Sequence, residues 1–109
     1  MVRVMEVSAY PHGQGACAVR LFAEYQNEFK DGDAVEVFVR TGPGTYVEFS
    51  ETISTSGGGC PELRDSAIKE WLVRLGHLDK SGRRQWPDGH PLQFYLTRLS
   101  DGVYVLEEK

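Results

Sequence analysis

The C-terminal segment contains two β-strand patterns that are apolar on both faces. Residues 92–100 and 103–107 flank Asp101-Gly102, a dipeptide that favours a type I′ turn within a hairpin. Apolar side chains alternate along both strands: Phe94 and Leu96 with Tyr95 and Leu99, and Val103 and Val105 with Tyr104 and Leu106. A strand that is apolar on both faces is covered on both faces. The fold must therefore place protein on each side of this hairpin.

Four further strands are predicted upstream, at 2–10, 16–25, 34–40 and 46–53. Residues 16–29 fit a helical stripe as well as a strand. We favour the strand, because the short break at 11–15 suggests a hairpin with the first strand. Gly42-Pro43-Gly44-Thr45 predicts a type II turn that joins the third and fourth strands.

The strongest helical pattern covers residues 61–75. Pro61 suits the first helical position, and the charge of Glu62 is favourable in the first turn. Apolar residues then recur at helical spacing: Leu63, Ala67, Ile68, Trp71, Leu72 and Leu75. A helix of this length is about 22 Å long and shields two or three strands at a spacing of about 4.8 Å.

These elements predict an α+β fold with a strongly bent antiparallel sheet of five or six strands. The main helix, at about residues 61–75, would pack on one face. A chain of 109 residues is too short for two hydrophobic cores, so residues 1–109 are expected to form a single domain. Because one short helix leaves apolar strand surface uncovered, the rest must be hidden by the sheet curling on itself or by a second copy of the chain, and we expect a homodimer.

Charge and composition restrict the partners and the compartment. The formal net charge is −4, which disfavours nucleic acid as a partner of the whole surface. No apolar run is long enough to span a membrane, and the N-terminal stretch lacks the apolar core of a signal peptide. Cys17 and Cys60 form no CxxC pair, so we expect free thiols and a cytoplasmic location.

The segment Ser56–Leu63, SGGGCPEL, places three glycines before a cysteine and the predicted helix. It lacks the Gly-Lys-Ser/Thr ending of a phosphate-binding loop, and Pro61 has no N–H to donate. Cys60 would be the helix N-cap, where the helix dipole favours a thiolate. Arg64 is the candidate for a second cation there. The simpler interpretation is a cysteine that caps the helix and has no chemical role.

No cofactor or metal site is predicted. His12, His77, His90 and the two cysteines are scattered singly and show no close ligand pair of the zinc-site type. The sequence therefore suggests no metal-dependent chemistry.

Residues 79–91 form a long loop with basic and aromatic side chains side by side. The candidates for a ligand or partner contact are Lys80, Arg83, Arg84, Trp86 and His90. The simpler interpretation is a loop pinned to the sheet by Trp86 and Pro87, with solvated arginines. Long ordered loops often carry function, so both interpretations are kept.

The sequence favours a non-enzymatic binding or interaction module that acts through a dimer surface or a cleft beside the 79–91 loop. One alternative is a small enzyme with Cys60 as the nucleophile and Arg64 as the anion contact. Another is a weak RNA-binding protein that uses Arg83, Arg84 and Trp86, which the acidic first half disfavours.

Overall fold

The fold comes from a computed structural model of the chain. It describes residues 3–12, 16–21, 28–30, 32–53, 61–81, 83–86 and 92–109. The elements within these residues are β1 (Arg3–His12), β2 (Ala16–Leu21), β3 (Ala34–Gly42), β4 (Thr45–Thr52), β5 (Glu62–Leu63), α1 (Ser66–Arg74), β6 (Gln93–Ser100) and β7 (Val103–Glu108).

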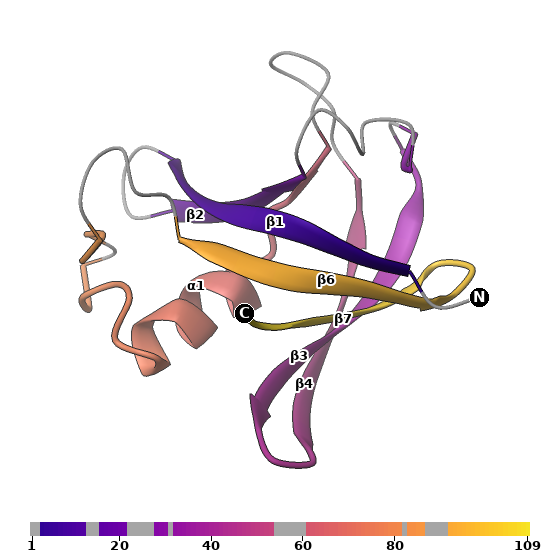
Figure 1. The fold of residues 1–109 in the computed structure, drawn as a ribbon. Helices are drawn as coiled ribbons and strands as arrows, with labels where there is room; N and C mark the ends of the chain where they lie inside the picture. Colours follow the sequence, from indigo (N-terminus) through magenta and orange to yellow (C-terminus); the bar gives the residue numbers. More distant parts are fainter. Residues whose placement is uncertain are drawn as a thin grey trace.

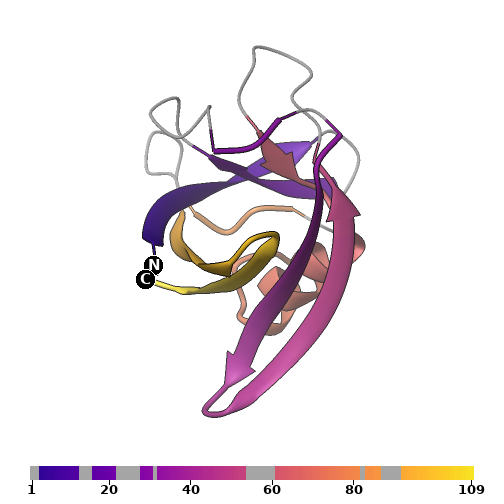
Figure 2. The ribbon, with the colours of Figure 1, turned by 90° about the vertical axis from the view of Figure 1, so that its right-hand side faces the viewer.

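The seven strands form one sheet in the order β4-β3-β7-β6-β1-β2-β5. The sheet curls into a nearly closed barrel with one helix, and the β3–β4 hairpin extends beyond it as an arm (Figures 1 and 2). The predicted α+β class and the bent sheet are confirmed. The expected count of five or six strands is too low, because the two-residue β5 carries no recognisable strand pattern.

The hairpins are close to those expected from the sequence. β1 pairs with β2, β3 with β4, and β6 with β7, all antiparallel. The strand interpretation is confirmed for residues 16–21, whereas residues 22–27 lie outside the described residues. β1 extends through Pro11 and His12, two residues into the break that the sequence predicted.

The turn between β6 and β7 is not of type I′. That turn needs positive φ at both central residues, and Asp101 keeps a negative φ while Gly102 has φ +76°. A register shift between Arg98 and Ser100 accompanies the turn. Gly44, at φ +71°, fits the third position of the predicted type II turn.

One pairing departs from the antiparallel expectation. β3 and β7 lie side by side in parallel, from Glu36 opposite Val103 to Val39 opposite Leu106. Between β4 and β7 the chain passes through β5, α1 and β6, and β7 then inserts between β3 and β6. Pairing over this sequence separation leaves no local signal in the sequence.

The helix begins at Ser66, so the predicted start at residue 61 is wrong. Asp65 is the N-cap, and its carboxylate accepts a hydrogen bond from the Ala67 N–H at 2.9 Å. Aspartate is among the best N-cap residues. Glu62 and Leu63 pair instead with Arg20 and Val19 of β2, which places both side chains in the interior. Burial against the sheet thus outweighs the local preference for helix.

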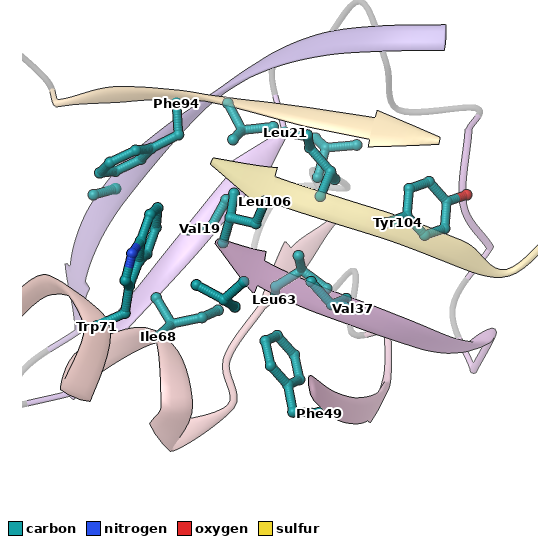
Figure 3. Packing of buried hydrophobic residues seen from close by; sticks show 14 of the residues in the cluster. Val19, Leu21, Val37, Phe49, Leu63, Ile68, Trp71, Phe94, Tyr104 and Leu106 are labelled. Atoms are coloured by element: carbon teal, nitrogen blue, oxygen red, sulfur yellow. The ribbon is translucent and has the colours of Figure 1, made fainter. Parts of the chain in front are cut away.

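The core fills the barrel and continues to the inner side of α1 (Figure 3). Met5, Val19, Leu96 and Leu106 are fully buried, and the Trp71 ring lies against Phe94 with the ring centres 4.8 Å apart. The inner face of the C-terminal hairpin is therefore dry within one subunit. The burial of Phe94 and Tyr104 on the same face agrees with the alternation in the sequence.

The open side of the barrel, between the end strands β4 and β5, is bridged by side chains. The Glu51 carboxylate of β4 accepts hydrogen bonds from the backbone N–H groups of Arg64 and Asp65, at 2.6–2.8 Å. The indole N–H of Trp71 donates to the carbonyl of Arg40 in β3, at 3.1 Å. Burial raises the pKa of Glu51, and this effect outweighs the hydrogen bonds, which lower it. These contacts hold α1 and the segment before it against the β3–β4 arm.

Candidate interaction surface

The outer face of the sheet carries a continuous row of apolar or weakly polar side chains across four strands. Val4 of β1 lies opposite Thr97 of β6, Thr97 lies opposite Val105 of β7, and Val105 lies opposite Phe38 of β3. We call these four residues the outer row. All four alternate with buried neighbours, so their side chains point away from the core. Val4 is 54% exposed, and the other three are half-buried.

Apolar side chains extend the outer row on both sides along the strands. Leu99, at the register shift of β6, is 46% exposed. Val103 and Tyr95 are half-buried on the same outer face. The hairpin that the sequence predicted to be apolar on both faces is therefore covered on its inner face only, within the described part of one subunit.

Charged side chains border the outer row on the Tyr95 side, and they are paired. Arg40 contacts Glu107 at 3.2 Å, and Lys109 contacts Glu6 at 2.9 Å. The Lys109 ammonium also lies 5.9 Å from the centre of the Tyr95 ring. The hydrogen bond from Lys109 to Glu6 raises the pKa of Lys109, so it stays charged at neutral pH. An apolar strip beside a neutralised polar rim has the composition of a protein–protein contact surface.

One end of the barrel is closed by an ion-pair cluster around Glu28. Its carboxylate contacts Arg3 at 3.4 Å and Arg98 at 3.7 Å, and Arg98 also pairs with Asp101. The neighbouring Phe29 ring packs on Tyr104, and burial raises the pKa of the Tyr104 hydroxyl. A cavity of about 240 Å³ lies beside this cluster. Carboxylates therefore already engage both guanidinium groups at this end of the barrel.

The helix that was predicted to begin beside Cys60 begins later in the chain. Cys60 lies outside the described residues, and the helix N-cap is Asp65, five residues later. The N-terminal end of the helix dipole therefore lies at Asp65. The Arg64 guanidinium contacts the buried carboxylate of Glu62 at 2.8 Å, and Glu62 also contacts Arg20 at 3.4 Å. The proposed roles of Cys60 and Arg64 in catalysis stay a prediction.

The basic loop is ordered by Asp79. The carboxylate of Asp79 accepts hydrogen bonds from the Ser81 hydroxyl at 2.6 Å and from the backbone N–H groups of Ser81 and Arg83 at 2.9 Å. The hydrogen bond from the Ser81 hydroxyl is the main reason that the pKa of Asp79 is lowered. Trp86 packs against the core cluster, as in the simpler interpretation of the sequence.

The basic side chains of this loop are exposed or half-buried. Lys80 and Arg83 are exposed, and Arg84 is half-buried. His90 lies outside the described residues. A role for these side chains in binding a ligand or partner stays a prediction.

Two larger hollows lie on other parts of the described surface. One of about 570 Å³ lies between the β3–β4 arm and the β6–β7 turn, and one of about 280 Å³ lies between the end of β3 and α1. Neither is lined by Lys80, Arg83, Arg84 or Trp86. No three His, Cys, Asp or Glu side chains among the described residues gather closely enough to hold a metal ion. Within the same residues, α1 is too short to cross a bilayer.

The comparisons with known proteins give no relative. No family model matches the chain, and neither a curated protein nor a solved structure matches it significantly. The functional argument therefore depends on the chain's own geometry.

The sequence missed that the outer row joins strands far apart in the chain. Alternation along residues 34–40 puts Phe38 on the face opposite Val35, Val37 and Val39, and alternation along residues 103–107 puts Val105 on one face of the C-terminal hairpin. The sequence alone does not show that Phe38 and Val105 are neighbours, because the parallel β3–β7 pairing follows from the closed fold. The alternation in each strand is the signal that would have identified these residues once the pairing was known.

Proposed function

We propose that this protein is a non-enzymatic interaction module that self-associates through the outer row. The supporting observation is an apolar strip across β1, β6, β7 and β3 that nothing within the described residues covers. Isolated exposed apolar residues are ordinary on a protein surface, whereas a contiguous strip with a paired polar rim is typical of a contact surface.

The size of the strip suits a weak and reversible contact. Four strands at about 4.8 Å span roughly 14 Å, and five residues along a strand span roughly 17 Å, which gives an apolar centre of about 240 Å². A stable interface buries about 800 Å² on each partner. The remainder would come from the rim formed by Arg40, Glu107, Glu6 and Lys109. Because these charges neutralise one another in pairs, the rim adds little repulsion between two copies.

Light scattering coupled to gel filtration tests this proposal directly. We expect the wild-type protein to show a mass that rises from monomer to dimer as its concentration increases through the micromolar range. Val4→Lys should keep the protein monomeric, because it places a charge at the β1 end of the strip, on the side chain of the outer row that is 54% exposed.

Val47→Lys is the matched control for this experiment. Val47 is 42% exposed and lies on β4, on the side of the sheet opposite the outer row. This variant should dimerise like the wild type. A wild-type protein that stays monomeric up to about 100 μM would overturn the proposal, and so would equal effects of the two substitutions.

A further inference from the structure

The outer edge of β4 presents backbone groups that no described strand pairs with. β4 lies at one end of the sheet and pairs only with β3 among the described strands. The Ile53 N–H donates to the Asp33 carbonyl, and the Gly32 N–H donates to the Ile53 carbonyl. Ile53 therefore faces β3, and in an antiparallel ladder every second residue faces the same way. The N–H and C=O groups of Tyr46, Glu48 and Ser50 consequently point away from the sheet.

Among the described residues, acidic side chains are the one protective feature of this edge. Edge strands are typically blocked by lysine, proline, a bulge or a covering segment. β4 contains neither lysine nor proline, and its pairing with β3 is regular from Thr52 to Tyr46. Tyr46 is 50% exposed, and Glu48 and Ser50 are exposed as well. Within the described residues, the hydrogen bonds from Arg64 and Asp65 reach only Glu51, so nothing there pairs with the outer edge of Thr45–Ser50.

The charge around this edge is negative. β4 carries Glu48 and Glu51 and has no basic residue. The hollow of about 570 Å³ adjoins Ser50 and Thr52 and is lined by Glu36 and by Asp101, of which Asp101 is paired with Arg98. Neither Glu36 nor Glu48 has an ion-pair partner among the described residues. A second copy of β4 is a poor occupant, because antiparallel self-pairing would bring acidic side chains together.

We propose that the edge of β4 binds an extended basic segment of a partner protein as an added strand. Backbone hydrogen bonds to Tyr46, Glu48 and Ser50 supply the affinity, and alternate side chains supply the specificity. Lysine or arginine side chains on the outer face contact Glu48 and reach across Ser50 to Glu36 in the hollow. This edge adjoins the outer row, because Glu48 lies opposite Phe38, but its backbone groups are not part of that row, so the proposal does not depend on self-association.

The opposite side of the added strand faces a surface of mixed character. Val47 borders a small cleft between the β3–β4 arm and α1, in which Val39, Ala67 and Trp71 supply the apolar lining. Thr41, Glu70 and Arg74 line the same cleft. Side chains of a strand alternate between the two faces of a sheet. The segment that fits this edge therefore alternates basic residues with small or branched apolar residues.

Binding of a capped (Lys-Val)4 peptide, followed by fluorescence polarisation at low salt, tests this proposal. Ser50→Pro should weaken binding about tenfold, the expected effect of losing one or two hydrogen bonds. The Ser50 N–H points away from β3, so the proline removes no bond of the sheet. Glu48→Lys should weaken binding about fivefold through charge alone. Glu6→Lys makes the same charge change four strands away and should leave binding within about twofold of the wild type.

The peptide itself provides a control that requires no variant to fold. A (Lys-Val)4 peptide N-methylated at alternate residues keeps its charge and loses its backbone donors on one edge, so it should bind at least tenfold more weakly. Equal binding of the methylated peptide would overturn the added strand, and equal binding of (Glu-Val)4 would overturn the preference for basic segments. Val4→Lys should leave peptide binding unchanged, and Ser50→Pro should leave the dimer unchanged, which separates this proposal from the proposed function.

Discussion

Replacing Trp71 by phenylalanine tests whether α1 holds the open side of the barrel to the β3–β4 arm. Trp71 is 3% exposed, its indole N–H donates to the Arg40 carbonyl, and its ring packs on Phe94. Arg40 directly follows the last residue of β3 that pairs with β7, so its carbonyl is bonded by the Trp71 indole and not by β7. Phenylalanine keeps an aromatic ring beside Phe94 but removes the donor.

The expected loss of stability combines two contributions. The hydrogen bond is worth about 1 kcal/mol, and the space left by the smaller ring costs about another 1 kcal/mol. A loss of about 2 kcal/mol lowers the midpoint of thermal unfolding by about 8 °C in a domain of this size. Urea unfolding followed by far-UV circular dichroism measures the free energy directly.

Trp86→Phe is the matched control for this prediction. Trp86 also packs on the core, but it is only half-buried and makes no hydrogen bond among the described residues. We expect Trp86→Phe to lower the free energy of unfolding by less than about 1 kcal/mol. If Trp71→Phe destabilises the protein no more than Trp86→Phe does, the indole bond does not hold the helix in place.

Three further predictions concern single positions. Burial raises the pKa of Glu51 above 4.5, so the folded state binds the proton of this carboxyl more tightly than the unfolded state does. The free energy of unfolding should therefore fall as the pH rises from about 4.5 through the folded-state pKa. Glu51→Gln should lack this decline, whereas the control Glu48→Gln should keep it. Urea unfolding at several pH values measures the decline, and identical pH profiles for the two variants would show that Glu51 does not cause it. Asp65→Ala should lower the free energy of unfolding by about 1 kcal/mol through loss of the N-cap, whereas Ser66→Ala should leave it nearly unchanged. Equal effects of the two substitutions in chemical unfolding would exclude Asp65 as the cap. Gly44→Ala should cost about 1 kcal/mol through its positive φ alone, since a Cβ there meets nothing within 4 Å, and an unchanged melting temperature would show that the turn relaxes.

The hairpins could be predicted from the sequence because their signals are local. Alternating valines and a Pro-Gly turn identify β3 and β4, and the Asp101-Gly102 step identifies β6 and β7. The start of α1 could not be fixed, because Pro61 and Glu62 suit a helix end while the better cap, Asp65, lies further on. Burial of Glu62 between two arginines is a tertiary effect.

The candidate surfaces depend on contacts that no single segment contains. The apolar outer face of the C-terminal hairpin was predicted, and it is the part of the interaction surface that sequence reasoning reached. The contribution of Phe38 and the open edge of β4 both follow from which strands become neighbours. Sequence alternation gives the face of a residue but not the strand beside it.

The position of β7 between β3 and β6 has a consequence for the order of folding. Among the described strands, the β3–β4 arm joins the rest of the sheet only through β7, which follows all of them along the chain. Until β7 is in place, the arm and the β1–β2–β6 portion share no strand pairing. We therefore expect the sheet to become cooperative only when β7 inserts between these two parts.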